Sequence, residues 1–144
     1  MRYWDASAIV PLLAEQPGTE LVRGYLAEDP HVVTWSLTRL EIAGAIERRA
    51  RQGALAPAAR IELLARLGEL GRAWDEVSDL LPVLERGLVL MARHPLRSAA
   101  AAQLAAASLL AEGEPASVSF VCLDRRLAEA ARREGFVVLG WPAG

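Results

Sequence analysis

The chain has 144 residues, of which 53% are hydrophobic and 24% charged, and its formal net charge at pH 7 is −2. These values fit one folded domain over residues 1–144 and exclude a disordered or fibrous protein. The low net charge excludes a basic coat over the whole surface, so any contact with nucleic acid must be local.

The single cysteine, Cys122, excludes an internal disulfide and gives no sign of an oxidising compartment. The first residues lack the apolar core of a signal peptide, and the longest Ala/Leu-rich stretch, residues 99–111, is too short to span a bilayer. We therefore expect no membrane segment and, by default, a cytoplasmic protein.

Short strands and longer helices alternate along the sequence, as judged from β-branched runs, helical spacing of apolar residues and Pro/Gly breaks. In chain order we expect a strand at residues 1–4, helices at 7–14 and 19–29, a strand at 31–35, helices at 38–51 and from 57, a strand at 74–78, helices from 80 and at 96–110, a strand at 117–123, a helix at 127–134 and a strand at 136–139.

Three of these helices carry clear apolar stripes, which we expect to face the core. Ser36 or Thr38 is the expected N-cap of the helix ending at Arg51, and Asp79 that of the helix that begins at residue 80. The expected core-facing residues are Leu37, Leu40, Ala43, Ile46 and Ala50 in the helix ending at Arg51, Ile61, Leu64 and Leu67 in the next, and Leu81, Leu84, Leu88 and Met91 in the third.

The alternation predicts an α/β fold in which a parallel sheet is sandwiched between helices. In such sheets ligands bind outside the carboxyl ends of the strands. Two expected strands run directly into an aspartate, Asp5 and Asp124, and Glu41 lies one turn into the helix after a third strand. Three acids distant in sequence are therefore expected to meet at one edge of the sheet.

Carboxylates so close together repel one another unless a cation neutralises them. With only two histidines and one cysteine in the chain, an oxygen-rich site suits Mg²⁺ or Mn²⁺ better than zinc. Such a site supports attack of water on a phosphodiester. Each acid also has an ordinary structural explanation: Asp5 and Asp124 as helix N-caps, and Glu41 as a first-turn acid favoured by the helix dipole.

Four segments together resemble the PIN domain, and within it the VapC-type toxins of bacterial and archaeal toxin–antitoxin pairs. Their order and spacing match over essentially the whole chain. The segments are Tyr3 to Ala8 (YWDASA), Thr38 to Ile42 (TRLEI), Pro95 to Ala99 (PLRSA) and Phe120 to Leu127 (FVCLDRRL).

The resemblance implies a PIN-like parallel sheet between helices and a ribonuclease that depends on Mg²⁺ or Mn²⁺. It implies that Asp5, Glu41 and Asp124 are the catalytic, metal-binding acids, and that the Ser7 hydroxyl bonds the first aspartate. It further implies an antitoxin that wraps the toxin, and a homodimer with the Ala-rich helix near its interface. We expect the antitoxin to sit on a groove lined by Leu12, Leu13, Leu21, Tyr25, Ile61 and Leu64.

One position departs strongly from the family pattern. Ala100 stands where the family has a fourth aspartate, and, as a milder departure, Cys122 stands where a Thr or Ser is usual. Loss of a carboxylate removes charge and oxygen ligands, so metal affinity and activity should fall. Two explanations stay open: a naturally weakened or inactive member, or a substitution introduced to disarm a toxic enzyme.

All 16 basic residues are arginine. Arg97, Arg125 and Arg126 flank the expected site, and we expect them to hold RNA phosphates. Ordinary solvated helix surface is the alternative, and for Arg97 pairing with the acidic cluster is another. Two other functions compete with the nuclease. A phosphotransfer enzyme with Asp5 as nucleophile would want a nearby lysine, which the chain lacks. A catalytically silent module that only binds an antitoxin or RNA is favoured by Ala100.

Overall fold

The computed structural model describes residues 1–140. Trp141, which we expect from the sequence to be the most exposed tryptophan, lies outside the described residues. Its five strands form one parallel sheet in the order β3-β2-β1-β4-β5. The strands are β1 (Arg2–Trp4), β2 (Val33–Trp35), β3 (Asp75–Val77), β4 (Ser119–Cys122) and β5 (Val137–Gly140). The helices are α1 (Ala6–Leu13), α2 (Thr19–Glu28), α3 (Thr38–Arg51), α4 (Pro57–Ala73), α5 (Leu80–Arg93), α6 (Ser98–Ala111), α7 (Arg125–Arg133) and the short 3₁₀ helix η1 (Pro115–Ser117).

The strand order reverses between β1 and β4. From β1 the chain builds outward through β2 to β3, and it then returns to the other side of β1 with β4 and β5. β1 pairs with β4 in the register Trp4 to Val121. In open parallel sheets this reversal opens a crevice at the carboxyl ends of the two central strands.

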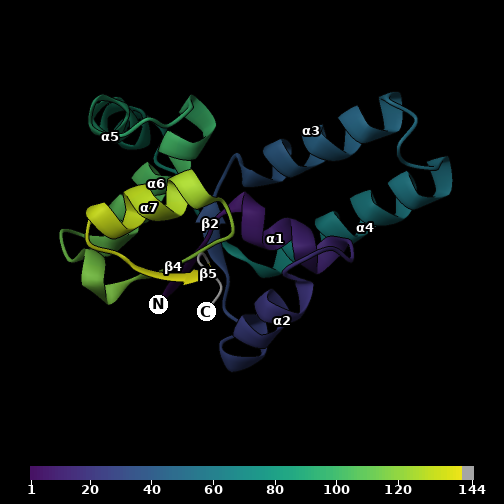
Figure 1. Ribbon diagram of the computed structural model, residues 1–144, viewed down its shortest axis with the longest axis horizontal. Helices are drawn as coiled ribbons and strands as arrows, with labels where there is room; N and C mark the ends of the chain where they lie inside the picture. Colours follow the sequence, from purple (N-terminus) through teal and green to yellow (C-terminus); the bar gives the residue numbers. More distant parts are fainter. Residues whose placement is uncertain (141–144) are drawn as a thin grey trace.

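Helices cover both faces of the sheet, as the sequence predicts (Figure 1). Alternate residues of β1 point to opposite faces, since strand side chains alternate. Tyr3 packs in a core with α5, α6 and α7, whereas Trp4 packs in a second core with α1, α2, α3 and α4. Figure 1 also shows α3 and α4 running away from the sheet as a neighbouring pair.

The apolar stripe of α5 does not face the core, and that of α3 does so only in part. At the start of α3, Leu37 and Leu40 are 46% and 68% exposed, which contradicts the prediction, whereas Ile46 is buried as predicted, together with Thr38 and Ile42. In α5 the leucine stripe is exposed, and Val83, Gly87 and Leu90 are buried. Periodicity marks an apolar face, and it does not say whether the core of the same chain covers that face.

Several boundaries and caps also differ from the prediction. The second strand begins at Val33, and His31 is exposed. Leu37 is the N-cap of α3 and makes no side-chain cap bond, and Asp79 caps α5 without one. α7 begins at Arg125, directly after Asp124, two residues before the predicted start. Among residues 1–140, no helix is long and apolar enough to cross a membrane.

Candidate metal site at the carboxyl edge of the sheet

Asp5 lies at the reversal of strand order, between the last residue of β1 and the first turn of α1. Its backbone N–H donates to the Val121 carbonyl, and its carboxylate accepts from the Ser7 backbone N–H at 3.1 Å, which makes it the N-cap of α1. The side chain is buried, since the residue is only 5% exposed. Burial raises the pKa of Asp5; hydrogen bonds from Ser7 oppose this, and the nearby charge of Asp124 raises it further.

Asp124 occupies the equivalent place after β4. Its carboxylate accepts from the Leu127 backbone N–H at 3.2 Å and caps α7. Both aspartates are therefore helix N-caps, one of the two roles considered from the sequence. Because the cap bond also holds each carboxylate at the carboxyl edge of the sheet, this role is compatible with metal binding.

The Ser7 hydroxyl ties these two turns together. It accepts from the Leu123 backbone N–H at 2.9 Å and lies 3.7 Å from the Cys122 Sγ. The Cys122 thiol in turn lies 3.8 Å from an Asp5 oxygen and 3.4 Å from the Asp124 carbonyl. The hydrogen bond that Ser7 donates to the Asp5 carboxylate comes from its backbone N–H. Ser7 thus holds the turn that carries Asp5 against the end of β4.

Glu41 reaches the same region from the first turn of α3. Burial raises its pKa to about 7, a hydrogen bond from Gln103 opposes this, and the charge of Asp5 raises it further. The carboxylate accepts from Gln103 Nε2 at 3.3 Å, and the same nitrogen donates to the Thr38 hydroxyl at 3.0 Å. Asp5 is thus electrostatically coupled to both other acids, which the sequence predicted would converge.

The donor chemistry fits a hard divalent cation, because every candidate ligand is a carboxylate oxygen. Burial raises the pKa of Asp5 and of Glu41, and the charge of a neighbouring acid adds to each rise, so a bound cation would favour the charged forms. Within residues 1–140, however, no three His, Cys, Asp or Glu side chains already form a group that could hold an ion. The acids therefore offer donor atoms that suit such a cation, but among residues 1–140 they do not form a preformed cage of three carboxylates.

Ala100 faces this edge from the first turn of α6. It lines a pocket of about 310 Å³ together with Asp124, Arg97 and Arg126. The structure therefore brings two of the three predicted phosphate-binding arginines to the acidic site. Arg125 points elsewhere: it pairs with Glu129 at 3.3 Å on the exposed side of α7.

Comparisons with known proteins show which fold this is. No protein-family model matches the sequence, and no curated protein is significantly similar to it. Solved structures do match: FitAcB from Neisseria gonorrhoeae has a TM-score of 0.73 at 17% identity and covers 97% of both chains. PAE2754 from Pyrobaculum aerophilum has a TM-score of 0.66 at 18% identity, covering 96% of this chain and 88% of its own. A toxin–antitoxin complex from Klebsiella pneumoniae has a TM-score of 0.60 at 12% identity, covering 86% and 87%.

The chain has a PIN-like fold. At these identities the likeness establishes the fold alone. Asp5 and Asp124 directly follow β1 and β4, and Glu41 lies in the first turn of the helix that follows β2.

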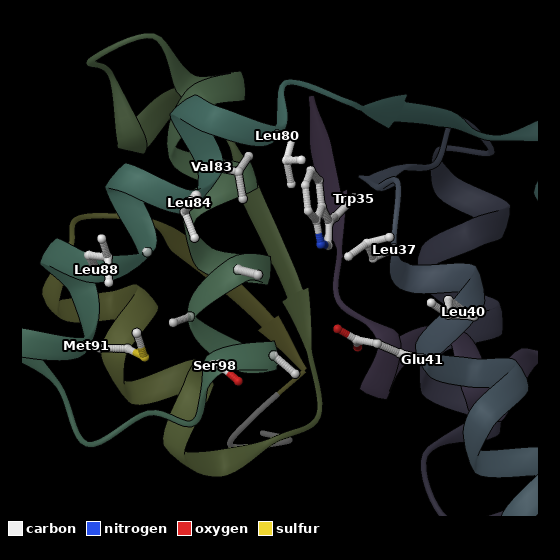
Figure 2. A pocket seen from close by; sticks show the side chains of 14 residues that line it. Trp35, Leu37, Leu40, Glu41, Leu80, Val83, Leu84, Leu88, Met91 and Ser98 are labelled. Atoms are coloured by element: carbon white, nitrogen blue, oxygen red, sulfur yellow. The ribbon is translucent and has the colours of Figure 1, made fainter.

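An apolar groove of about 420 Å³ opens beside Glu41 (Figure 2). Its walls come from α5 and α6 on one side and from Trp35 and the start of α3 on the other. Figure 2 shows the Glu41 carboxylate at one end, pointing from α3 towards the space between the two walls. The exposed groove residues on α5 and α3 are Leu37, Leu40, Leu80, Leu84, Leu88 and Met91.

Two predicted partner surfaces look different in the structure. The Ala-rich helix α6 is largely an internal element, with Leu104 and its alanine neighbours fully buried, so it presents little free surface. Of the residues expected to seat an antitoxin, Leu13 is buried in the core, and Leu12, Tyr25 and Leu64 pack half-buried against it.

Gln103, Thr38 and Tyr3 are site neighbours that the sequence does not reveal. Gln103 stands in an Ala/Leu helix, and Thr38 is predicted only as a helix cap. A lone polar residue in an apolar helical run is the available signal, since such a residue is buried only when it is hydrogen-bonded.

Proposed function

We propose that this chain is the toxin of a toxin–antitoxin pair, a VapC-type ribonuclease that depends on Mg²⁺ or Mn²⁺ and is weakened by Ala100. The observation that carries the proposal is the buried Asp5 at the reversal of strand order, with its pKa raised and with Glu41 and Asp124 coupled to it. The toxin–antitoxin complex from Klebsiella pneumoniae, which shares the fold, supports the assignment.

In this proposal Asp5, Glu41 and Asp124 hold the cation. When bound, the cation supplies positive charge that stabilises a phosphodiester under attack by water. Asp5 and Asp124 are already oriented by their cap bonds, which limits the reorganisation that binding requires. Glu41 carries a proton about half the time near pH 7, so a cation must displace that proton, and its affinity should increase from about pH 6 to about pH 8.

Arg97 and Arg126 are the proposed phosphate contacts, because they share a pocket with Asp124. Arg125 stays a weaker candidate because Glu129 pairs with it. Replacing Arg97 and Arg126 with Ala should weaken RNA binding and flatten its salt dependence by about two phosphate contacts. An unchanged salt slope would remove these arginines from the proposal.

Nuclease activity is tested with a labelled structured RNA incubated with the native chain, Ala100→Asp and Asp5→Asn, in Mn²⁺ and in EDTA. We expect Ala100→Asp to cleave faster than the native chain, and Asp5→Asn and all EDTA samples to leave the RNA intact. If Ala100→Asp cleaves no RNA at any Mn²⁺ concentration, the nuclease proposal is wrong.

The silent module is the second candidate, favoured by Ala100 and by the lack of a three-carboxylate group within residues 1–140. It predicts binding of a partner with no response to Mn²⁺. The same experiment separates the two, because a silent module shows no difference between Mn²⁺ and EDTA in the native chain.

We further propose a homodimer that forms through the exposed face of α5 and the start of α3, with the first turns of the Ala-rich helix α6 lining the groove beside it. Leu40, Leu81, Leu84 and Leu88 are each more than half exposed there, and monomeric proteins rarely leave so large an apolar patch open. The Leu84→Glu variant should be monomeric in analytical ultracentrifugation, whereas Ile61→Glu, at an equally exposed site on α4, should stay dimeric.

An antitoxin that covers the acidic site and a cytoplasmic location are proposed on the same toxin–antitoxin basis.

A further inference from the structure

Gln103 is a buried amide whose hydrogen bonds are all made inside the protein. The residue is 1% exposed. Its Oε1 accepts from the Tyr3 hydroxyl at 2.5 Å, and its Nε2 donates to the Thr38 hydroxyl at 3.0 Å and to Glu41 Oε2 at 3.3 Å. These bonds join α6 to β1 and to the first turn of α3, far apart in sequence.

The direction of every bond in this network is fixed by proton counting. Thr34 donates its only hydroxyl proton to the Trp4 carbonyl at 2.7 Å. The bond of 2.8 Å between Thr34 and Thr38 must therefore be donated by Thr38. The Thr38 oxygen is then left to accept, and Gln103 Nε2 is the donor beside it.

The opposite orientation of the Gln103 amide is excluded by the same count. It would place Oε1 beside a Thr38 oxygen that has no proton left to give. It would also point the NH₂ group at Tyr3, whose fully buried hydroxyl would lose its acceptor. A buried donor without an acceptor is costly. One amide N–H is thus committed to Thr38, and the other is left for Glu41.

We propose that Gln103 is a positioning residue for the metal site, which holds the Glu41 carboxylate inward as an acceptor and so presents it towards Asp5. The inference rests on the proposed metal site. Gln103 lies one turn after Ala100 on α6. Although α6 has no acid at position 100, it thus provides the amide that donates a hydrogen bond to Glu41. An unbranched apolar residue at 103 would leave Glu41 free to turn to solvent.

The test is a double-mutant cycle on Mn²⁺ affinity, measured by electron paramagnetic resonance of the full chain. Gln103→Met keeps the length of the side chain and removes the donor. We expect it to weaken Mn²⁺ binding about tenfold, as fits the loss of one hydrogen bond to a charged group. In the Glu41→Gln background the same change should have no further effect. Gln52→Met, at the exposed end of α3, is the matched control and should bind Mn²⁺ like the native chain.

An equal loss of Mn²⁺ affinity in both backgrounds would show a general structural role and would overturn the proposal. Unchanged affinity in Gln103→Met would overturn it as well. If Gln103→Met does not fold, Tyr3→Phe replaces it: loss of the hydroxyl frees the Gln103 amide, so Mn²⁺ affinity should fall only when Glu41 is present.

The outcome separates this inference from the proposed function. If neither the native chain nor Ala100→Asp binds Mn²⁺, the metal site itself is wrong. A crystal structure of Gln103→Met then decides the positioning role: Glu41 turned to solvent supports it, and Glu41 in its present orientation refutes it.

Discussion

Replacing Glu41 with glutamine should stabilise the metal-free protein at neutral and alkaline pH. The amide of the Glu41→Gln variant would keep an oxygen that accepts from Gln103 and would lose the charge that Asp5 repels. Burial raises the pKa of Glu41 from 4.5 to about 7. The hydrogen bond from Gln103 offsets part of this rise, and the charge of Asp5 adds to it. This rise corresponds to about 3.4 kcal/mol, at about 1.36 kcal/mol for each pKa unit. Because Glu41 is partly exposed, solvent screening reduces the expected gain to about 1–2 kcal/mol.

The pH dependence gives this prediction its sign. Below pH 4.5 Glu41 is protonated in both the folded and the unfolded chain, so the variant gains nothing. Between pH 4.5 and 7 the unfolded chain releases the proton first, and the folded state progressively loses stability that the variant keeps. Above about pH 7 the difference between the two proteins should be constant.

The assay is denaturant unfolding in EDTA at about pH 4, 5.5 and 8, which are below, within and above this pH window. Glu69→Gln, at an exposed position of α4, is the control. At the highest pH the Glu41→Gln variant should also melt about 3–6 °C above the native chain. Saturating Mn²⁺ should reduce or reverse this order, because the native chain binds the ion better. Equal stabilisation at the lowest and highest pH, or none at the highest, would refute the account of Glu41.

Three further predictions concern residues other than the three acids. Glu134 accepts a hydrogen bond of 2.6 Å from His94 Nε2, and both side chains are nearly buried. In urea titrations Glu134→Gln should therefore lower the free energy of unfolding by about 2 kcal/mol. The control Glu129→Gln, on the surface, should change it by less than about 0.5 kcal/mol. The Cys122 thiol is fully buried and its pKa is raised by burial, so an aromatic disulfide reagent should label it only after unfolding; rapid labelling of native protein would contradict this. Gly140 has a φ of +122°, and a Cβ there would collide with the Cys122 backbone carbonyl. Gly140→Ala should therefore lower the free energy of unfolding by more than about 2 kcal/mol in the same titrations. Gly24→Ala, at an open position of α2, should instead raise it by up to about 1 kcal/mol.

The parallel sheet and the positions of Asp5 and Asp124 could be predicted because the local sequence signals for strand ends and helix caps agree with the fold. Asp5 and Asp124 each end a short apolar strand and begin a helix, and a residue that caps a helix after a parallel strand must lie at the carboxyl edge. Glu41 lies in the first turn of the helix that follows β2, so it too starts near this edge.

The burial of α3 and α5 could not be predicted in the same way. Leu40 and Leu84 belong to regular apolar stripes, yet both are exposed in the single chain. An apolar stripe can be covered by a partner as well as by the core, so the spacing alone does not tell which of the two it will be. The role of Thr38 was missed for a related reason: its hydroxyl is used by buried Gln103, which no spacing rule links to it.

The central claim is that a cation site is centred on Asp5 and is weakened because position 100 lacks a carboxylate. Calorimetric titration of Mn²⁺ into the native chain, Ala100→Asp and Asp5→Asn tests it most directly. The account predicts that Ala100→Asp binds at least about tenfold more tightly than the native chain, since a charged ligand contributes more than about 1.4 kcal/mol, and that Asp5→Asn does not bind. Equal affinity of all three proteins would contradict it.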